Sequence, residues 1–309
     1  MSAPFLPAPP AGQCLLFELS PAVGGCALTA QGLGPDLTAY DVILLSLSGG
    51  KDSQLTARLV AEAARTAGVL GRVVAVHAYL QEDWPDAHEY ARMHAAAYGV
   101  ERFEVVRAGE SLLAHVRRRG KWPSAAVRWC TSDHKRAPIS ALMTVLADEI
   151  DPRALGRPVR ILNTMGLRAA ESSGRAKRPA HGHNRRESNK TRRHVDNWLP
   201  IHDLSTLEVQ AALDSGDVPH HPHYDSEAGP WTGLTRLSCR LCVLASMQDL
   251  TRSVELDPEW ALEYVEVEQV TGHDFRHGMP ISEILRIAAD RAAARHAKER
   301  AEAGSNGQI

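Results

Sequence analysis

The sequence contains no run of apolar residues that approaches the roughly 20 needed to cross a membrane. Residues 1–10 are rich in proline and carry no basic region ahead of an apolar one, which excludes a typical secretory signal. These two absences predict a cytoplasmic protein that has no membrane partner.

Cysteine is scarce, and neither sign of charge is in excess. Five cysteines in 309 residues, an odd number, do not indicate a disulfide framework, so we expect reduced thiols or thiolates bound to a metal. With a formal net charge of -2, the chain as a whole is not built to bind a polyanion, and any nucleic-acid surface has to be a local patch. With 44% hydrophobic residues, the chain can bury a large core.

Apolar runs alternate with amphipathic segments over the first half of the chain. Continuous apolar runs predict strands that are buried on both faces, and apolar residues at helical spacing predict the helices between them. This order predicts an α/β fold with a doubly wound parallel sheet and right-handed crossovers. Strands are expected at residues 42–47, 73–78, 103–106 and 159–165, and helices at residues 55–63, 87–98 and 140–150.

Two segments lack this periodicity. Residues 1–40 are predicted to be an irregular lead-in with one short hairpin, and residues 181–194 are polar, basic and without a repeating pattern. Helices are expected after Asp257 and Ile281, and the composition from about Arg300 is that of a disordered tail. The chain is therefore divided into a lead-in (1–40), a main domain (41–250) and a helical C-terminal segment with a disordered tail (251–309).

A glycine-rich turn joins the first predicted strand to the first predicted helix. Gly49 and Gly50 let the backbone turn tightly and approach a ligand without a Cβ atom in the way. The N–H groups and the dipole of the following helix favour an anion there, while Lys51 adds a positive charge and Ser53 a hydroxyl donor. The simpler interpretation is a helix cap made by Asp52 or Ser53.

This turn is not a Walker A loop, because Leu45 occupies the position of the first glycine and Asp52 follows the lysine. It resembles the SGGxDS signature of the PP-loop nucleotide hydrolases. The resemblance implies a loop that holds the pyrophosphate of ATP or the phosphosulfate end of PAPS. The matching residues are Ser48, Gly49, Gly50, Lys51, Asp52 and Ser53.

A second segment closes the fourth predicted strand. Its Gly166, Arg168, Glu171 and Ser172 resemble the GxRxxES segment of the PAPS reductase family. A guanidinium group makes bidentate contacts with phosphate or sulfate, and Glu171 is expected to orient Arg168 or to help with a metal. Both segments follow predicted strands, and open α/β sheets bind ligands at the carboxyl ends of strands, so both can face one ligand. The alternative is a solvated Arg–Glu pair.

Residues 129–139 resemble a third part of the same family. Cluster-bearing members carry a Cys-Cys pair followed by a lysine and a proline. Cys130 matches the first cysteine, Thr131 stands in place of the second, and Lys135 keeps its spacing as a further phosphate-side cation. With a later Pro-x-Tyr-Asp stretch and a Cys-x-x-Cys pair, the resemblance covers roughly residues 41–245.

The cysteines allow three interpretations. Cys239 and Cys242 are spaced to hold one metal or one edge of a cluster, with Cys130 as a third ligand from across the site. The resemblance implies that these three residues hold a 4Fe-4S cluster. The same thiols with His134 would instead form a structural zinc site, or they are packed thiols or a redox pair.

The resemblance further implies an adenine nucleotide alpha hydrolase-like fold and an ATP-dependent reaction with Mg²⁺. An acceptor oxygen is expected to attack the α-phosphorus of ATP, and sulfur then displaces AMP, as in the DNA phosphorothioation proteins and tRNA thiolases. Lys51, Asp52, Lys135 and Arg168 are the expected catalytic residues, and the cations stabilise the leaving pyrophosphate.

Two other functions stay open. One is a PAPS or APS reductase, although no cysteine follows Cys242, and thioredoxin-dependent members place their nucleophilic cysteine in a C-terminal tail. The other is a non-catalytic nucleotide-binding subunit of a modification or defence complex. Turnover of PAPS or APS to sulfite identifies the first, and nucleotide binding without turnover identifies the second.

Weaker signals concern partners. Residues 181–194 could hold a nucleic-acid acceptor, or they could be a solvated loop. Sulfur-donor proteins or modification-complex proteins are further expected partners. His220, His221 and His223 look like a metal cluster, but they fall in the Pro-x-Tyr-Asp stretch, so metal binding is not expected of them. The basic residues of the segment are Arg185, Arg186, Lys190, Arg192 and Arg193.

Overall fold

The computed structural model describes residues 18–22, 25–29 and 34–305. A six-stranded sheet in the order β5-β4-β3-β6-β8-β7 forms its centre. All neighbouring strands are parallel except β7 and β8, which confirms the predicted α/β fold with a mostly parallel sheet. The strands are β3 (Val42–Ser46), β4 (Val73–Tyr79), β5 (Arg102–Arg107), β6 (Val159–Met165), β7 (His181–His183) and β8 (Arg193–Trp198).

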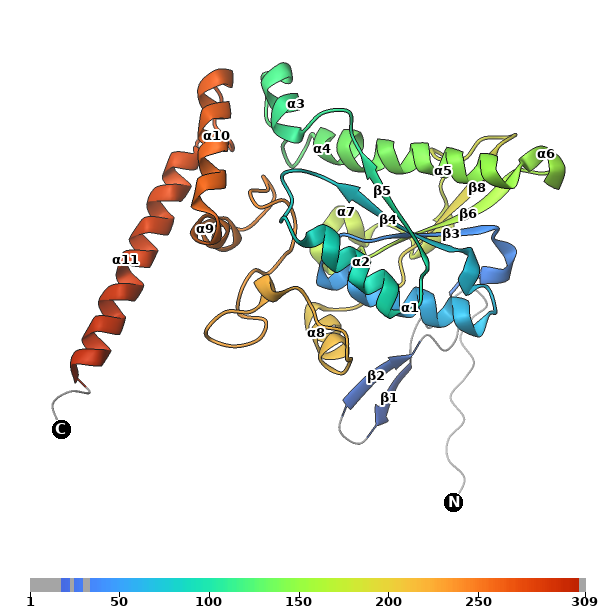
Figure 1. Ribbon diagram of the computed structural model, residues 1–309, viewed down its shortest axis with the longest axis horizontal. Coiled ribbons are helices and arrows are strands. Elements are labelled where there is room, and N and C mark those ends of the chain that lie inside the picture. Colours follow the sequence, from blue (N-terminus) through green and yellow to red (C-terminus); the bar gives the residue numbers. More distant parts are fainter. Residues whose placement is uncertain (1–17, 23–24, 30–33, 306–309) are drawn as a thin grey trace.

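Helices cover both faces of this sheet (Figure 1). On one face lie α1 (Lys51–Thr66) and α2 (Ala87–Ala97), and on the other lies α5 (Ala137–Ile150). The side chains of Ile43 and Leu45 join the core beside α1, while Leu44 joins the core beside α5, and all three are fully buried. Burial on both faces explains why β3 is a continuous apolar run rather than an alternating one.

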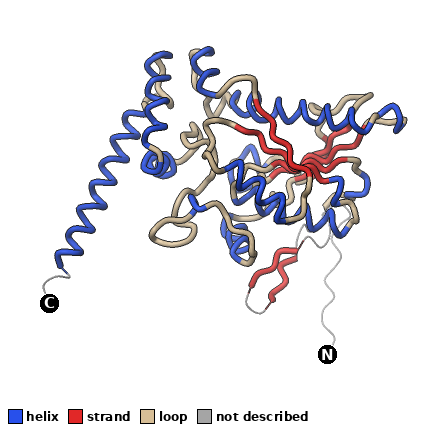
Figure 2. Tube along the Cα trace, viewed as in Figure 1, coloured by secondary structure: helices blue, strands red, loops and turns tan. Residues whose placement is uncertain are grey.

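The C-terminal helices form a second core, with α3 packed against them. Tyr264, Phe275, Ile281 and Ile284 are buried together with side chains of α3. Figure 2 shows these helices to one side of the sheet, reached through a long segment that is mostly loop. The remaining helices are α3 (Leu112–Arg119), α4 (Trp129–Thr131), α6 (Pro152–Leu155), α7 (Ser173–Ala176), α8 (Thr206–Asp214), α9 (Met247–Leu256), α10 (Pro258–Thr271) and α11 (Ile281–Ser305).

Residues 181–194 contain strand, so the prediction of a wholly irregular segment is wrong. β7 pairs antiparallel with β8, whose first residue is Arg193. Arg193 is buried because its guanidinium donates to the carbonyls of Ser140 at 2.6 Å and Glu187 at 2.7 Å. A buried polar residue with hydrogen-bond partners leaves no hydrophobic signal in the sequence, which is why these strands escape a pattern-based prediction.

The two ends of the described chain also test the sequence-based expectations. The short hairpin predicted in the lead-in is present as β1 (Glu18–Ala22) and β2 (Gly25–Thr29). Helix α11 continues to Ser305, so the prediction of disorder is wrong for residues 301–305, where alanine and glutamate favour helix. Within the described residues, no helix is long and apolar enough to cross a membrane.

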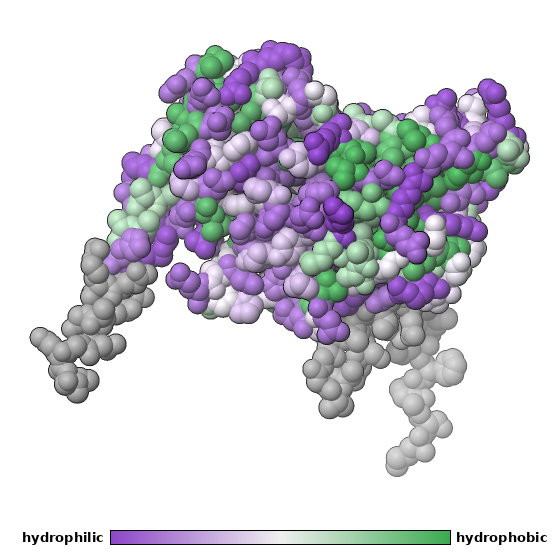
Figure 3. Space-filling view, viewed as in Figure 1, coloured by the Kyte–Doolittle hydropathy of each residue, from purple (hydrophilic) through white to green (hydrophobic). Residues whose placement is uncertain are grey.

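The visible surface divides into an apolar and a polar part (Figure 3). Hydrophobic side chains gather at the right of the view, over α5 and α6, where Val145 is 51% and Leu155 is 38% exposed. The central surface, between the sheet and the C-terminal helices, is mostly hydrophilic. The face of the sheet region beside the C-terminal helices is therefore polar.

Candidate functional site

Short-range contacts hold the glycine turn between β3 and α1. Gly49 has a φ of 79°, and a Cβ atom there would lie 2.3 Å from the carbonyl oxygen of Ala87. The Ser53 hydroxyl accepts from the N–H of Ser48 at 3.2 Å and donates to the carbonyl of Gly50 at 2.8 Å. Position 49 therefore requires glycine, and the Ser53 hydroxyl is used to close the turn.

The turn lies where the strand order of the sheet reverses, between β3 and β6. From β3 the chain adds β4 and β5 on one side, and it then crosses to the other side as β6. The last residues of β3 and β6, Ser46 and Met165, are partners in the sheet. A Cβ atom on Gly166 would lie 2.7 Å from the carbonyl oxygen of Asp52, so the segments that follow the two strands are in contact. Such a crevice at the carboxyl ends of strands is where doubly wound sheets bind ligands.

The Lys51 side chain leaves the turn and binds the chain ahead of Cys239. It is 2% exposed, and its Nζ donates to the carbonyl of Thr235 at 2.7 Å and lies 4.8 Å from the ring centre of Tyr224. The phenol oxygen of Tyr224 accepts from the backbone N–H groups of Lys51 at 3.1 Å and Leu237 at 3.2 Å. Burial lowers the pKa of the Lys51 ammonium, and the carboxylate of Asp52 opposes that change. Lys51 and Tyr224 thus join the turn to the cysteine loop.

Arg168 is bound to Asp52, not to Glu171. Its Nε lies 2.8 Å from Asp52 Oδ1, its Nη1 donates to Thr206 Oγ1 at 3.0 Å, and the residue is 4% exposed. Glu171 instead accepts from the backbone N–H of Arg168 at 3.1 Å. The alternative of a solvated Arg–Glu pair is therefore wrong. The guanidinium links α1 to the start of α8, and a bidentate contact with phosphate would require it to leave these partners.

Several arginines gather around Glu171. Arg175 forms an ion pair with Glu171 Oε2, and Arg236 Nη2 lies 3.9 Å from Glu171 Oε1. Burial, together with repulsion from Arg236 and Arg128, lowers the pKa of Arg175 to about 10. The charge of Arg236 also contributes to the lowered pKa of Lys51 in the turn. One carboxylate facing several guanidinium groups leaves a net positive charge, which favours an anion beside the turn.

The Cys-x-x-Cys loop is attached to the segment that follows β4. Cys239 and Asp83 form an isolated antiparallel bridge, and the backbone N–H of Arg240 donates to the carbonyl of Glu82 at 2.9 Å. Burial of the thiol and the nearby Asp83 carboxylate raise the pKa of Cys239. This contact brings the cysteine loop to the carboxyl edge of the sheet.

Lys135 lies beside Asp83, the residue that pairs with Cys239. It belongs to η3 (Ser132–Arg136), a π-helical turn ahead of α5, and its Nζ is 3.6 Å from Asp83 Oδ2. Burial lowers the pKa of Lys135, but Asp83 and the thiolate charges of Cys239, Cys242 and Cys130 outweigh it and raise that pKa. The structure therefore places Lys135 at Asp83, the residue that is paired with Cys239 in the isolated bridge.

The three cysteines do not form a compact single-ion site in the described part of the chain. Among the residues that the structure describes, no group of three metal-ligating atoms within 4.8 Å of one another contains a cysteine. Two thiolates on one tetrahedral zinc lie about 3.8 Å apart, whereas a cluster binds each thiolate on a separate iron, farther apart. His134 Nε2 lies 3.0 Å from His115 Nδ1, and both rings line a cavity of about 440 Å³ with Glu110 and Asp133. His134 is thus paired with His115, and the zinc site with His134 stays an alternative prediction.

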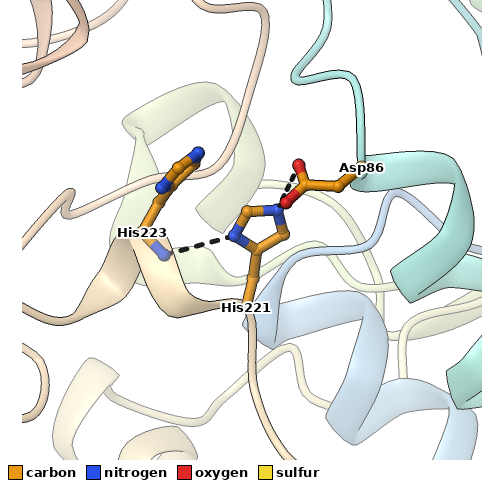
Figure 4. A group of neighbouring side chains, drawn as sticks. All are labelled: Asp86, His221 and His223. Carbon is orange, nitrogen blue, oxygen red and sulfur yellow. Dashed lines mark hydrogen bonds and ion pairs between the residues drawn. The ribbon is translucent and has the colours of Figure 1, made fainter. Parts of the chain in front are cut away.

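The histidines of the Pro-x-Tyr-Asp stretch are fixed by hydrogen bonds (Figure 4). His221 is fully buried, its Nε2 lies 3.0 Å from Asp86 Oδ1, and its Nδ1 accepts from the backbone N–H of His223 at 3.3 Å. The ring of His223 lies against Trp84, with 4.1 Å between ring centres. Both ring nitrogens of His221 are used, and these contacts hold the Tyr224 segment against α2.

The basic residues of the 181–194 segment divide into two kinds. Arg193 is buried and tied to α5, so it cannot contact a polynucleotide. Arg192 lies 3.3 Å from Asp148, and the side chains of Arg185 and Arg186 are exposed. The nucleic-acid surface stays a prediction, carried by fewer side chains than the sequence offered.

Sequence reasoning assigned no role to Tyr224, Arg175 or Arg236. A signal was available for the arginines, because each lies three residues from a matched motif position, Ser172 or Cys239. Tyr224 stands in the Pro-x-Tyr-Asp stretch of the resemblance, but its role was not predicted, because its phenol accepts from backbone groups of Lys51, which is remote in the sequence, and of Leu237.

Comparison with known proteins gives one family match. The family model described as "Phosphoadenosine phosphosulfate reductase domain" matches residues 42–245. No curated protein matches the sequence.

Several solved structures are similar in shape at low identity. FMN adenylyltransferase from Candida glabrata has 10% identity and a TM-score of 0.42, with 65% of this chain and 57% of that chain covered. PAPS reductase from Candida auris has 15% identity and a TM-score of 0.39, with 62% and 83% covered. The U34-tRNA thiolase NcsA from Methanococcus maripaludis, with its 4Fe-4S cluster, has 12% identity and a TM-score of 0.38, with 83% and 76% covered. These similarities are too low to carry a functional argument.

Proposed function

Because the chain belongs to the phosphoadenosine phosphosulfate reductase domain family, we propose that it binds ATP at the turn between β3 and α1 and activates an acceptor for sulfur transfer. One observation carries this proposal. The glycine turn and the arginines beside Glu171 both follow the adjacent strands β3 and β6, where the strand order of the sheet reverses, so backbone N–H groups and guanidinium groups lie at the same edge of the sheet.

The start of α1 and the arginine cluster supply the phosphate contacts. The N-cap residue Gly50 has no side chain to cap the helix, and the N–H of Lys51 is taken by Tyr224, so the N–H groups of Asp52 and Ser53 are the ones proposed to face the ligand. Arg175 and Arg236 bind the β- and γ-phosphates, and Glu171 holds both arginines in place. Mg²⁺ would be held by phosphate oxygens together with Asp52, which follows the turn.

The proposed reaction has two displacements, the first at the α-phosphorus of ATP and the second at the activated acceptor. An acceptor oxygen attacks the α-phosphorus of ATP, and the bond to pyrophosphate breaks as that group leaves with the electron pair. A hydrosulfide then attacks the acceptor carbon, the bond from that carbon to the adenylated oxygen breaks, and AMP leaves with this oxygen and the electron pair. From buried positions, Lys51 and Arg168 raise the positive potential at the turn, which favours the charge on the leaving pyrophosphate.

Cys130, Cys239 and Cys242 are the ligands proposed for a 4Fe-4S cluster. When bound, such a cluster would supply an iron that is free to hold sulfide, because only three thiolates serve its four irons. Lys135 balances the thiolate charge of these cysteines. Thr131, where a fourth cysteine stands in some members, directly precedes the π-helical turn Ser132–Arg136.

Metal content and nucleotide turnover test this function. Protein purified without oxygen is expected to contain about four irons per chain and to absorb broadly in the visible range. Cys239→Ser should lose the iron, whereas Thr131→Ala, a substitution beside Cys130 that removes no thiol, should keep it. One zinc per chain, or no metal, would remove the cluster and leave an ATP-dependent adenylating enzyme.

The products distinguish the remaining alternatives. Formation of AMP and pyrophosphate from ATP supports the proposal. Release of sulfite from PAPS or APS in the presence of a thiol reductant would identify a reductase instead. Binding of ATP without turnover, with partner proteins present, would identify a non-catalytic subunit.

A further inference from the structure

The antiparallel edge of the sheet carries three histidines and an aspartate on one face. In the register of β7 and β8, His183 lies directly opposite Asp196. His194 precedes Asp196 by two residues on β8, so both side chains point to the same side of the sheet. His181 precedes His183 by two residues on β7 and shares that side as well. The strand pairing alone therefore brings these groups together.

Two imidazole rings converge on one carboxylate oxygen. His183 Nδ1 lies 3.2 Å from Asp196 Oδ1, and His194 Nε2 lies 3.1 Å from the same atom. The two rings are stacked with 4.4 Å between their centres, and the three ligating atoms all lie within 4.8 Å of one another. On a tetrahedral metal with bonds of about 2.1 Å, neighbouring ligand atoms lie about 3.4 Å apart. Only small rotations separate the observed geometry from that of a metal site.

The carboxylate is held from behind by a buried tyrosine. Tyr40, which is 3% exposed, donates its hydroxyl to Asp196 Oδ2 at 2.9 Å. The same hydroxyl lies 3.1 Å from His181 Nε2. Metal-ligating carboxylates are characteristically oriented by such an outer hydrogen bond, which leaves the other oxygen directed at the ion.

The group is open to solvent on its histidine side. The side chains of His183 and His194 are 39% and 43% exposed, whereas that of Asp196 is 11% exposed. In the Asp86–His221–His223 group, by contrast, His221 is fully buried and uses both ring nitrogens in hydrogen bonds. Of the two candidate groups found among the described residues, only the group at the sheet edge combines a preformed geometry with access for an ion from solvent.

We propose that His183, His194 and Asp196 bind one divalent ion of the Zn²⁺ class, with solvent in the fourth position. Two imidazole nitrogens and one carboxylate oxygen suit zinc rather than Mg²⁺ or Ca²⁺, which prefer oxygen ligands. The ion replaces the two ring protons that face Asp196 Oδ1. It would clamp β7 to β8 and, through Tyr40, fasten the residues ahead of β3 to the sheet edge. The site is independent of the nucleotide chemistry proposed above.

Zinc titration of the full-length, EDTA-treated protein tests the site. Calorimetry should detect a binding event that survives in Cys239→Ser, because the cysteine loop is not involved. Replacing a ligand should weaken that event by more than about 100-fold, since loss of an outer hydrogen bond alone changes metal affinity about 10- to 100-fold. His183→Ala and Asp196→Asn are the ligand variants, Tyr40→Phe removes the outer bond, and His277→Ala removes an exposed histidine elsewhere.

The relative loss of zinc affinity in the variants decides whether the site exists. We expect His183→Ala to abolish the event, Tyr40→Phe to weaken it about tenfold or more, and His277→Ala to leave it unchanged. His183→Ala removes a largely exposed side chain, so its fold can be checked by circular dichroism and is expected to be intact. Wild-type zinc affinity in that folded variant, or an anomalous zinc peak away from Asp196 in a soaked crystal, would overturn the proposal and leave only His–Asp hydrogen bonds.

Discussion

Replacing Gly49 by alanine tests the turn on which the nucleotide proposal depends. The residue has a φ of 79°, and an added Cβ would lie 2.3 Å from the carbonyl oxygen of Ala87, at the start of α2. The left-handed conformation costs a residue with a Cβ about 1–2 kcal/mol. Relief of the overlap requires the turn or the start of α2 to move by about 1 Å, which adds about 1–3 kcal/mol, as for other overpacked sites.

Gly68→Ala is the matched control. Gly68 has a φ of 69°, and a Cβ there would meet no atom within 4 Å. It therefore carries the same conformational cost and the same change in the unfolded chain, but it has no overlap. The difference between the two variants in the free energy of unfolding isolates the overlap at Gly49, which we expect to be about 1–3 kcal/mol.

The assay combines urea denaturation with calorimetric binding of a non-hydrolysable ATP analogue. Gly49→Ala should weaken the analogue by more than about tenfold, because a shifted turn no longer directs its N–H groups at the phosphates, whereas Gly68→Ala should bind normally. If Gly49→Ala were as stable as Gly68→Ala and bound the analogue with wild-type affinity, neither the close approach to Ala87 nor the role of the turn would stand.

Three further predictions concern buried or clustered charges. Burial lowers the pKa of His94 to about 4, so protonation of the unfolded chain below its ordinary pKa of 6.5 destabilises the fold as pH falls towards 4. Between pH 7 and pH 5, the wild type should therefore lose about 2 kcal/mol of unfolding free energy that His94→Gln keeps. Denaturant titrations of both proteins at the two pH values measure this difference. Arg168→Met leaves the carboxylate of Asp52 without its cation and should cost about 3 kcal/mol of unfolding free energy, whereas Arg286→Ala, from an exposed pair, should cost much less; equal losses would refute the distinction. Arg236→Ala should weaken ATP binding about tenfold without changing stability, while the exposed Arg186→Ala should leave binding as it is; titration of both variants with ATP decides.

Much of the fold was readable from the sequence, because its signals are local. The run that forms β3 is apolar on both faces, and the strands at residues 73–78 and 159–165 follow from the same rule, whereas β5 lies at the edge of the sheet and is only partly buried. The strands at the antiparallel edge were not readable. Their buried Arg193 and Asp196 are stabilised by hydrogen bonds to α5 and Tyr40, and such compensation produces no pattern along the chain.

The candidate site likewise has features that the sequence determines locally and features that depend on the tertiary structure. The positive φ of Gly49 is a property of one turn, so the sequence by itself determined it, whereas the close approach of Ala87 depends on how α2 packs. Only the tertiary structure decided which partner each charged residue takes: Lys51 binds Thr235, Arg168 binds Asp52, and Lys135 pairs with Asp83. A long side chain pairs with whatever the packed strands and loops bring within reach, and that choice depends on contacts between residues far apart in the chain.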